Sequence, residues 1–293
     1  MKWRGRRRSS NVDDRRRGGG AMSRVPTSGK IGIPALLAIL VAVLLGGNLD
    51  GSSLDDILGQ LNGVQPQAPT RNDPTLETAP DPDADLAAFA GVVLGSTEDL
   101  WATIFGNAGR QYRPAPLVLF SGTTQSGCGG ANSRVGPHYC PTDQTVYIDL
   151  DFFRELANRF DAPGDFAQAY VLAHEVGHHV QNLLGISDEV RRLQQSGPAD
   201  ANQLSVRMEL QADCFAGVWA YAEFTQDFLE SGDLEEAIGA AGAVGDDRIQ
   251  EMSTGMINPE TWTHGSSEQR IEWFRAGFDS GDPNACDTFG DDF

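Results

Sequence analysis

The feature that most constrains this chain is one stretch, Asp165 to Gly185, with the sequence DFAQAYVLAHEVGHHVQNLLG. It contains the spacing His-Glu-x-x-His. Residues four apart lie on one face of a helix, so His174 and His178 can direct imidazole nitrogens at a single ion. Glu175 would then lie within reach of a water molecule held by that ion. The stretch therefore predicts a zinc site with its own general base.

The residues around this motif favour a helix. Asp165 is a suitable N-cap, residues 166–184 contain no proline, and Gly185 is typical of a helix end. Apolar residues recur every three or four positions, which predicts a core-packed face: Tyr170, Ala173, Val176, Val180 and Leu184. Gly177 costs the helix about 1 kcal/mol relative to alanine. We therefore expect a close approach there, by the ion or by another backbone.

The alternative is that the two histidines are ordinary helix residues. A third ligand would decide between these interpretations, because catalytic zinc takes three protein ligands and a water molecule. His179 points about 100° away from His178 around the helix and cannot share the ion. A second helix, expected at about residues 206–228, offers Glu209 and Asp213 on one largely apolar helix. We expect Glu209 to be the third ligand and Asp213 to accept the outer N–H of a ligating histidine. A solvated acidic stripe is the competing interpretation.

Charge divides the chain near residue 30. Residues 1–30 carry ten Lys or Arg against two Asp, a charge of +8 in a chain of −19, which leaves −27 for residues 31–293. A basic tail on one side of a barrier and an acidic domain on the other would explain this break. Nucleic-acid binding is disfavoured, because Trp3 is the one aromatic residue among these charges.

The barrier expected is a membrane, because residues 31–47 form an uncharged apolar run. Its 17 residues are at the short limit for a transmembrane helix. A cleaved signal peptide has a similar plan, but no A-x-A cleavage site follows the run. We expect an uncleaved single-pass anchor in the cell membrane, with residues 1–30 in the cytoplasm and the acidic domain outside.

The rest of the chain divides into a tether and one domain. Residues 48–83 are rich in Pro, Gly and Asp and predict a disordered tether, and residues 84–293 are enough for one domain. Residues 86–105 have helical spacing, interrupted near Gly95, and residues 116–121 and 145–150 predict strands. A Gly-rich loop separates these strands. Further helices are expected at residues 152–160, 166–184, about 206–228 and 271–278, which makes the fold class α+β.

Four cysteines fit an exported domain with two disulfides. Cys128 with Cys140 would close a short loop, and Cys214 with Cys286 would tie the second long helix to the C-terminal tail. The alternative for the first pair is a structural zinc site. It is weak, because His138 alone would have to join the two thiolates.

At several stretches the sequence resembles the bacterial neutral zinc metallopeptidase family, with which it shares SGCGGANSRVGPHYCP, TVYIDLDFF, GDFAQAYVLAHEVGHHVQNLLG, ELQADCFAGVWA and HGSSEQR. The resemblance covers residues 92–289. More distantly, the sequence is similar to the thermolysin-like zincins, in which a glutamate on a later helix completes the zinc site and an aspartate four residues on supports a histidine. The family resemblance implies a single-pass anchor and peptidase chemistry on a zincin-like domain.

The expected activity is zinc-dependent hydrolysis of peptide or protein substrates, with Glu175 as general base. His264 is the candidate for a second group that stabilises the oxyanion, and its alternative is a loop histidine bonded to Glu268. The strand at residues 145–150 is a candidate for pairing with an extended substrate. Two other functions stay open: an inactive, zinc-stabilised binding module outside the cytoplasm, and a hydrolase of non-protein amides of the cell envelope.

Overall fold

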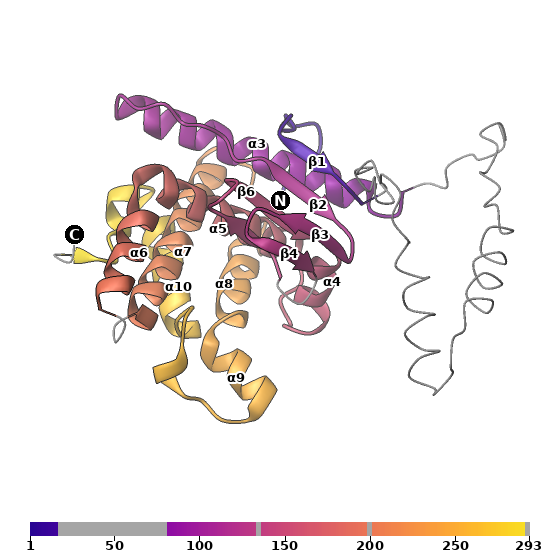
Figure 1. The fold of residues 1–293 in the computed structure, drawn as a ribbon. Helices are drawn as coiled ribbons and strands as arrows, with labels where there is room; N and C mark the ends of the chain where they lie inside the picture. Colours follow the sequence, from indigo (N-terminus) through magenta and orange to yellow (C-terminus); the bar gives the residue numbers. More distant parts are fainter. Residues whose placement is uncertain (17–80, 133–135, 198–200, 291–293) are drawn as a thin grey trace, which may run out of the picture. The chain divides into compact units, whose positions relative to one another are not determined.

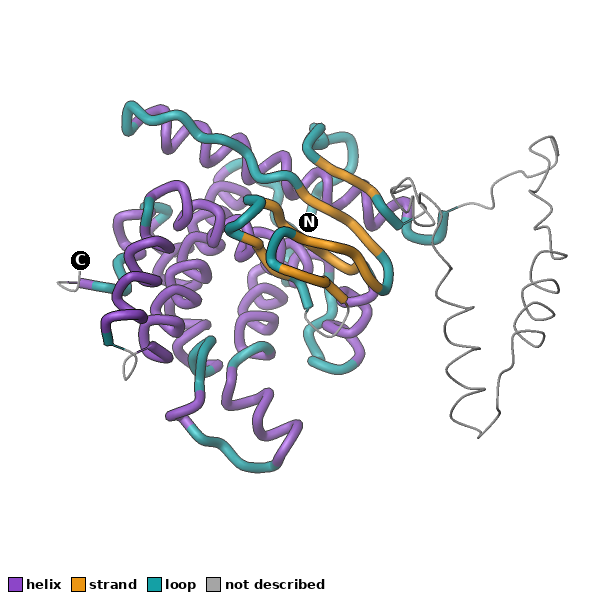
Figure 2. The backbone as a smooth tube through the Cα atoms, in the orientation of Figure 1, coloured by secondary structure: helices purple, strands orange, loops and turns teal. Residues whose placement is uncertain are grey.

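The computed structural model describes residues 1–16, 81–132, 136–197 and 201–290 (Figure 1). These residues form an α+β domain, as predicted (Figure 2). The predicted membrane segment, residues 31–47, and nearly all of the predicted tether, residues 48–83, lie outside the described residues. Within the described residues, no helix combines the length and the apolar character that crossing a membrane requires.

The sheet of the domain contains four strands in the order β1-β2-β6-β5. Its centre is formed by β2 (Leu117–Phe120) and β6 (Thr145–Asp149), which run parallel at the two expected positions. At one edge β1 (Val12–Asp14) is parallel to β2, and at the other β5 (His138–Cys140) is antiparallel to β6. The predicted pairing of residues 145–150 with substrate is wrong, because β6 has a neighbour on both sides. The edge next to the active-site helix belongs to β5.

The two faces of the sheet pack against different partners. Alternate side chains such as Leu119 and Ile148 join the main core with the helices, whereas Val118 and Tyr147 belong to a separate small cluster. A hairpin of β3 (Thr123–Ser126) and β4 (Gly129–Asn132) contributes to that second cluster. The stretch expected to be a Gly-rich loop, residues 126–141, therefore contains β4 and β5.

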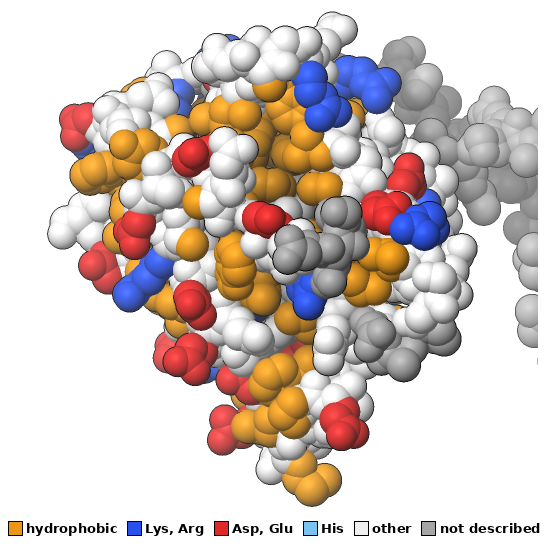
Figure 3. All heavy atoms as spheres, turned by 90° about the vertical axis from the view of Figure 1, so that its left-hand side faces the viewer, with side chains coloured by type: hydrophobic (Ala, Val, Ile, Leu, Met, Phe, Trp, Pro, Cys, Tyr) orange, Lys and Arg blue, Asp and Glu red, His pale blue; other side chains and the backbone are white. Residues whose placement is uncertain are grey.

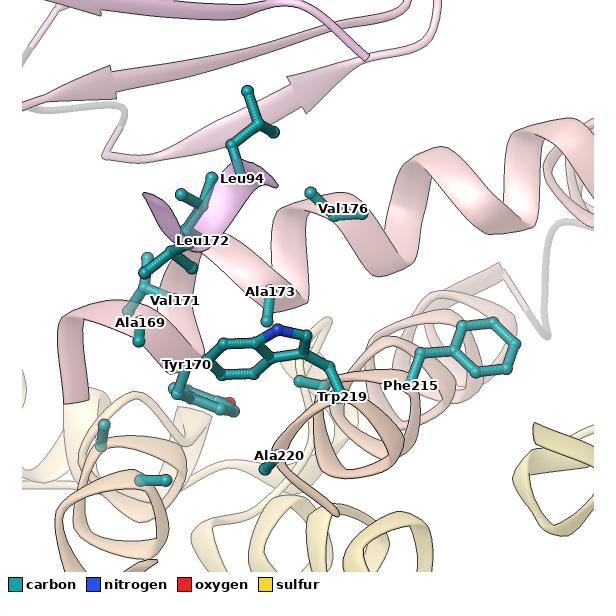
Figure 4. Packing of buried hydrophobic residues seen from close by; sticks show 14 of the residues in the cluster. Leu94, Ala169, Tyr170, Val171, Leu172, Ala173, Val176, Phe215, Trp219 and Ala220 are labelled. Carbon is teal, nitrogen blue, oxygen red and sulfur yellow. The ribbon is translucent and has the colours of Figure 1, made fainter. Parts of the chain in front are cut away.

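The main core is built around the active-site helix. This helix is α5 (Asp165–Leu184), and it packs against α3 (Ala84–Asn107), α6 (Ile186–Ser196), α7 (Ala201–Thr225) and α8 (Asp233–Ala243). A further helix, α10 (Ser267–Ser280), packs against α7 and α8. In Figure 4, side chains from α5 meet Phe215, Trp219 and Ala220 of α7 and Leu94 of α3. The indole of Trp219 stacks on Phe166 and is fully buried. Smaller elements complete the fold: α4 (Asp151–Asn158), α9 (Asp246–Thr254), η2 (Pro259–Thr261) and η3 (Pro283–Cys286).

Residues 1–16, named the arm here, are part of this domain, which corrects the prediction of a separate basic tail. The arm supplies β1 and makes ion pairs with the helices. Arg6 donates hydrogen bonds of 2.5 and 2.9 Å to the nearly buried carboxylate of Glu223, and Arg7 pairs with Glu98 at 3.1 Å. The change of charge sign along the chain therefore reflects ion pairing within one domain.

The arm also explains why α3 continues through Gly95, where an interruption was predicted. A Cβ at this position would lie 3.1 Å from the Arg7 carbonyl oxygen and 3.2 Å from the Ser9 nitrogen. The absent side chain lets the arm cross the helix at close range. The glycine therefore marks a crossing of two chain segments instead of a helix break.

Both predicted disulfides are confirmed. Cys128 is joined to Cys140, which connects the β3–β4 hairpin to edge strand β5. Cys214 is joined to Cys286, which connects α7 to η3 near the C-terminus. No cysteine of the chain is left as a free thiol.

Candidate metal centre

Helix α5 carries the motif almost as predicted. It begins at Asp165, one residue early, and its N-cap is Gly164, while Glu236 of α8 accepts a hydrogen bond from the Phe166 N–H at 3.0 Å. Gly185 closes the helix in the left-handed conformation, with φ of 85°. These ends place the motif in the middle of the helix, where its backbone is held by packing on several sides.

Gly177 brings the second helix close to the first. A Cβ at Gly177 would lie 3.0 Å from the carbonyl oxygen of Ala212 on α7 and 3.1 Å from its Cα. Of the two explanations offered for this glycine, the structure therefore supports the approach of another backbone. The short distance between the helices lets an acidic side chain of α7 reach the histidines of α5.

The three predicted ligands lie together. Glu209 Oε2 is 3.1 Å from His174 Nε2, and Glu209 Oε1 is 3.4 Å from His178 Nε2. One ligand atom from each residue lies within 4.8 Å of the others. Two imidazoles and one carboxylate are a common donor set for catalytic zinc, which needs a fourth position for water. The residues therefore fit a zinc ion.

Asp213 binds the outer nitrogen of His174, as expected, and is itself fully buried. Its Oδ1 accepts a hydrogen bond from His174 Nδ1 at 2.8 Å and another from the hydroxyl of Tyr170. Arg270 of α10 donates to both oxygens of Asp213, at 2.8 and 2.9 Å. The buried guanidinium neutralises the carboxylate, so the whole cluster holds His174 in one orientation.

A neutral set of groups orients His178. Its Nδ1 lies 2.9 Å from Gln181 Oε1, and the Gln181 amide donates to the Met208 carbonyl at 2.7 Å and to Gln211 at 3.1 Å. Gln211 in turn donates to the carbonyl oxygen of Cys286 at 2.9 Å. The second disulfide is therefore connected to a metal-site histidine through two buried glutamines.

The charges in this cluster support one another against the cost of burial. Burial lowers the pKa of His174, whereas Asp213 and Glu209 raise it, to about 10. Burial raises the pKa of Glu209, whereas His178 and His174 hold it well below its usual range. Protons and a metal ion compete for the same nitrogens. The cluster is therefore suited to hold positive charge.

Glu175 is nearly buried and lines the same cavity as the three ligands. This cavity has a volume of about 350 Å³ and includes apolar side chains such as Phe152, Val171 and Ile249. A second cavity of about 320 Å³ shares Tyr139, His178 and Glu209 with the first. The metal site therefore lies where the two cavities meet, in a cleft with space on both sides.

His264 lies in this cleft, but its partner is not the expected one. Its Nδ1 is 3.2 Å from Asp246 Oδ1, and no hydrogen bond joins it to Glu268 among the described residues. Asp246 Oδ2 also accepts the backbone N–H groups of residues 263–265, at 2.7, 2.6 and 3.1 Å. The hydrogen bond to Asp246 is the first cause that raises the pKa of His264, against burial.

His179 lies outside the metal site, as predicted, and has a different set of partners. Burial lowers its pKa, so the ring is neutral. Its Nε2 donates to the Arg113 carbonyl at 2.6 Å, which leaves Nδ1 to accept the Tyr139 hydroxyl at 3.1 Å. Since Tyr139 is in β5, the ring joins the active-site helix to the edge strand.

The sequence analysis missed two residues of the site, Arg270 and Asp246. Arg270 lies within the stretch HGSSEQR, which was quoted only for the family resemblance. Asp246 is 18 residues before His264 in a Gly- and Ala-rich segment without a recognised motif. Neither position carries a local signal for a role at the cleft.

Comparisons with known proteins agree with this geometry. The family described as "Putative neutral zinc metallopeptidase" matches residues 1–289, which includes the arm. "Uncharacterized protein YpfJ" of Escherichia coli (strain K12) is 50% identical over 297 aligned positions that cover 99% of each chain. "Uncharacterized protein Rv2575" of Mycobacterium tuberculosis is 51% identical over 189 positions, 61% of this chain and 63% of that protein. No solved structure matches.

Proposed function

The chain belongs to the neutral zinc metallopeptidase family, and on that premise we propose that it hydrolyses peptide bonds with zinc held by His174, His178 and Glu209. The observation that carries the proposal is the convergence of these three side chains at the junction of two cavities. Bound there, zinc would lower the pKa of a water molecule toward about 7 and polarise the scissile carbonyl. The domain would then be zincin-like, with α5 as the active-site helix.

Glu175 is the proposed general base. Its carboxylate lies in the cavity beside the ligands, so it takes a proton from the attacking water and returns that proton to the leaving amine. The surrounding apolar side chains limit access of other water molecules, which strengthens the charge interactions. The two proton transfers need no other acid or base.

His264 is the proposed hydrogen-bond donor to the oxyanion. Because the carboxylate of Asp246 binds Nδ1, the nitrogen left for the cavity is Nε2. With Nδ1–H donated to the carboxylate, Nε2 carries a proton only when the ring is protonated. The hydrogen bond to Asp246 raises the pKa of His264, so Asp246 both orients the ring and favours its protonated form.

The open edge of β5 is the proposed binding site for the substrate backbone. Pro137, His138 and Tyr139 line the first cavity, and Tyr139 also lines the second. An extended peptide beside β5 would pass the metal site and reach both cavities. His179 and the Cys128–Cys140 disulfide hold this strand in place.

For the location of the protein we propose association with the cell membrane through residues 31–47, in an oxidising compartment that suits the two disulfides. A single crossing would place β1 and β2 on opposite sides of the membrane, so it is incompatible with their pairing. The arm and residues 81–293 therefore occupy the same side. Tags placed at either terminus should have equal accessibility to external protease in spheroplasts.

The experiment for the activity compares Glu175→Gln with the unaltered chain. We expect turnover of a peptide library to fall by about 10² to 10⁴-fold, with zinc content unchanged. Glu272→Gln, an exposed change on α10, is the matched control. Activity retained in Glu175→Gln, or cleavage of a cell-wall preparation in place of peptides, would refute the proposal.

A further inference from the structure

A concentration of exposed apolar side chains lies beside the cleft. Among the described residues, seven large hydrophobic side chains are exposed, and four of them fall within nine positions: Ile249, Met252, Met256 and Ile257. Met256 is 74% and Ile257 51% exposed. They belong to the segment Asp246–Thr261, named the lobe here, which consists of α9, a connection and η2. The lobe projects from the helices at the bottom of Figure 1, and apolar side chains gather there in Figure 3.

Polar interactions hold the lobe in shape. Gln250 Oε1 accepts the Asn258 N–H at 2.8 Å and the indole N–H of Trp262 at 3.3 Å, and the Gln250 amide donates to Thr261 at 2.9 Å. At the base of the lobe, Asp247 accepts the Ser267 N–H and hydroxyl, both at 2.8 Å. Hydrogen bonds between polar groups therefore hold the lobe, and its large apolar side chains are left exposed. This arrangement has a cost in water that a partner would offset.

One side chain of the lobe lines the cleft. Ile249 lines the catalytic cavity together with Glu175 and His264, and the same side chain is 37% exposed. Met252 is three positions further along α9, so it shares a face of the helix with Ile249. A chain that leaves the cavity past Ile249 therefore has Met252 next to it.

Charge and side-chain type identify the occupant. The lobe carries Asp246, Asp247, Glu251 and Glu260 against the single basic residue Arg248, which disfavours an anionic lipid surface or a nucleic acid. Methionine side chains adapt to partners of many shapes. An uncharged or basic polypeptide with apolar side chains fits both features. The proposed binding beside β5 needs an extended backbone. An unfolded polypeptide offers that backbone together with exposed apolar side chains, so it is the occupant that fits both the cleft and the lobe.

We propose that the lobe is a docking surface for unfolded polypeptide substrates, which bind it with apolar side chains outside the scissile region. This proposal rests on the proposed peptidase function and names its substrate class. Short peptides that end within the cleft do not reach the lobe. Long unfolded chains do, and bind more tightly.

The test measures binding and turnover separately. The zinc-loaded full chain with Glu175→Gln is titrated into fluorescently labelled lysozyme that has been reduced and carboxamidomethylated, which gives an unfolded basic chain with neutral groups on its cysteines. Adding Met252→Ser, Met256→Ser and Ile257→Ser together should raise the Kd about tenfold or more. Phe224→Ser, which removes a 57% exposed side chain from α7, is the matched control and should leave the Kd unchanged. In the active chain, the same triple change should lower kcat/KM for the unfolded protein by a similar factor and leave a hexapeptide substrate unaffected.

Equal binding by the triple variant and its parent would overturn the proposal. The proposal would also be overturned if the lobe were needed for binding of zwitterionic phosphatidylcholine vesicles, or for formation of a dimer, but not for binding of the unfolded lysozyme. If the triple variant loses zinc or helical structure, Met256→Ser alone carries the test, with an expected two- to threefold rise in Kd. If the triple change weakens binding of the unfolded protein but the unaltered chain does not hydrolyse it, the peptidase function is refuted and the docking surface still stands.

Discussion

The floor of the cleft and its rim are stabilised in different ways. The floor, formed by α5, α7 and α10, contains ionisable groups that are nearly or fully buried, with Arg270, Asp213 and His174 in mutual contact. The rim, formed by His264 and the lobe, is half-buried to exposed except at Asp246, whose buried carboxylate binds the backbone of residues 263–265. The floor is held by contacts between buried charges, whereas the rim is held mainly by hydrogen bonds to Asp246, Asp247 and Gln250.

This difference separates two kinds of effect. Removing one member of a buried ionic cluster leaves the others without compensation, so changes in the floor should act on metal binding. Changes in the rim leave the floor intact and should act on turnover or on substrate binding. The following experiments test this separation, from the largest expected effect to the smallest.

Loss of a ligand should have the largest effect. We expect Glu209→Ala to lose most of its zinc and nearly all activity, because two imidazoles alone leave the ion short of one protein ligand. Elemental analysis of the purified chain measures the zinc, and Glu272→Ala is a control at an exposed site of α10. Full zinc occupancy in Glu209→Ala would remove this residue from the ligand set.

Loss of the rim histidine should leave the metal in place. We expect His264→Ala to lower kcat by about 10² to 10³-fold with little change in KM or zinc content, because its hydrogen bond forms mainly in the transition state. Steady-state kinetics on a peptide substrate provides the measurement. A kcat within threefold of the original would make His264 a structural residue. Loss of zinc would instead place it among the ligands and contradict the separation of floor and rim.

The groups behind His174 should affect metal affinity to a smaller extent. Asp213→Asn is expected to weaken zinc binding by about 10 to 100-fold, because His174 loses the carboxylate that orients it. Arg270→Met should act in the same direction, since the Asp213 charge would lose its neutralising partner. Competition with a chelator measures both affinities. Normal affinity in both variants would show that His174 is held by packing alone.

The smallest expected effect is a shift in pH dependence. Asp246 raises the pKa of His264 by accepting its hydrogen bond, burial opposes this, Glu209 adds to it and Arg270 opposes it. Activity that needs the protonated ring falls as the pH rises through this raised pKa. Asp246→Asn removes the carboxylate and lowers the pKa, so the alkaline limb of the kcat profile should move to lower pH. Bound zinc lowers the pKa of His264 in the parent chain and in Asp246→Asn alike. If the alkaline limb of the kcat profile does not move, it reports the titration of another group.

The sequence by itself determined the parts of this protein that follow from helical periodicity and from recognisable side-chain chemistry. The apolar spacing in residues 166–184 and the glycine that follows predicted α5 to within one residue of its start. Two acidic residues on an apolar helix predicted that Glu209 and Asp213 face the histidines, and the structure brings them there. The two disulfide pairs were also predicted correctly. For the helix and the ligands, periodicity and side-chain chemistry identify the residues that come together. For the cysteines, chemistry predicts disulfides, and the pairing was one of three possible.

Only the tertiary structure decided how the arm, the edge strand and the rim are used. The arm is polar and basic, and its strand contains two aspartates. It forms a strand because β2 pairs with its backbone and because carboxylates of distant helices form ion pairs with its arginines. Strand β5 has three residues and forms because β6 and His179 hold it. Asp246 and Arg270 meet the cleft through contacts 18 and 57 residues away in sequence. These interactions gain free energy only once the chain is folded, so local patterns could not reveal them.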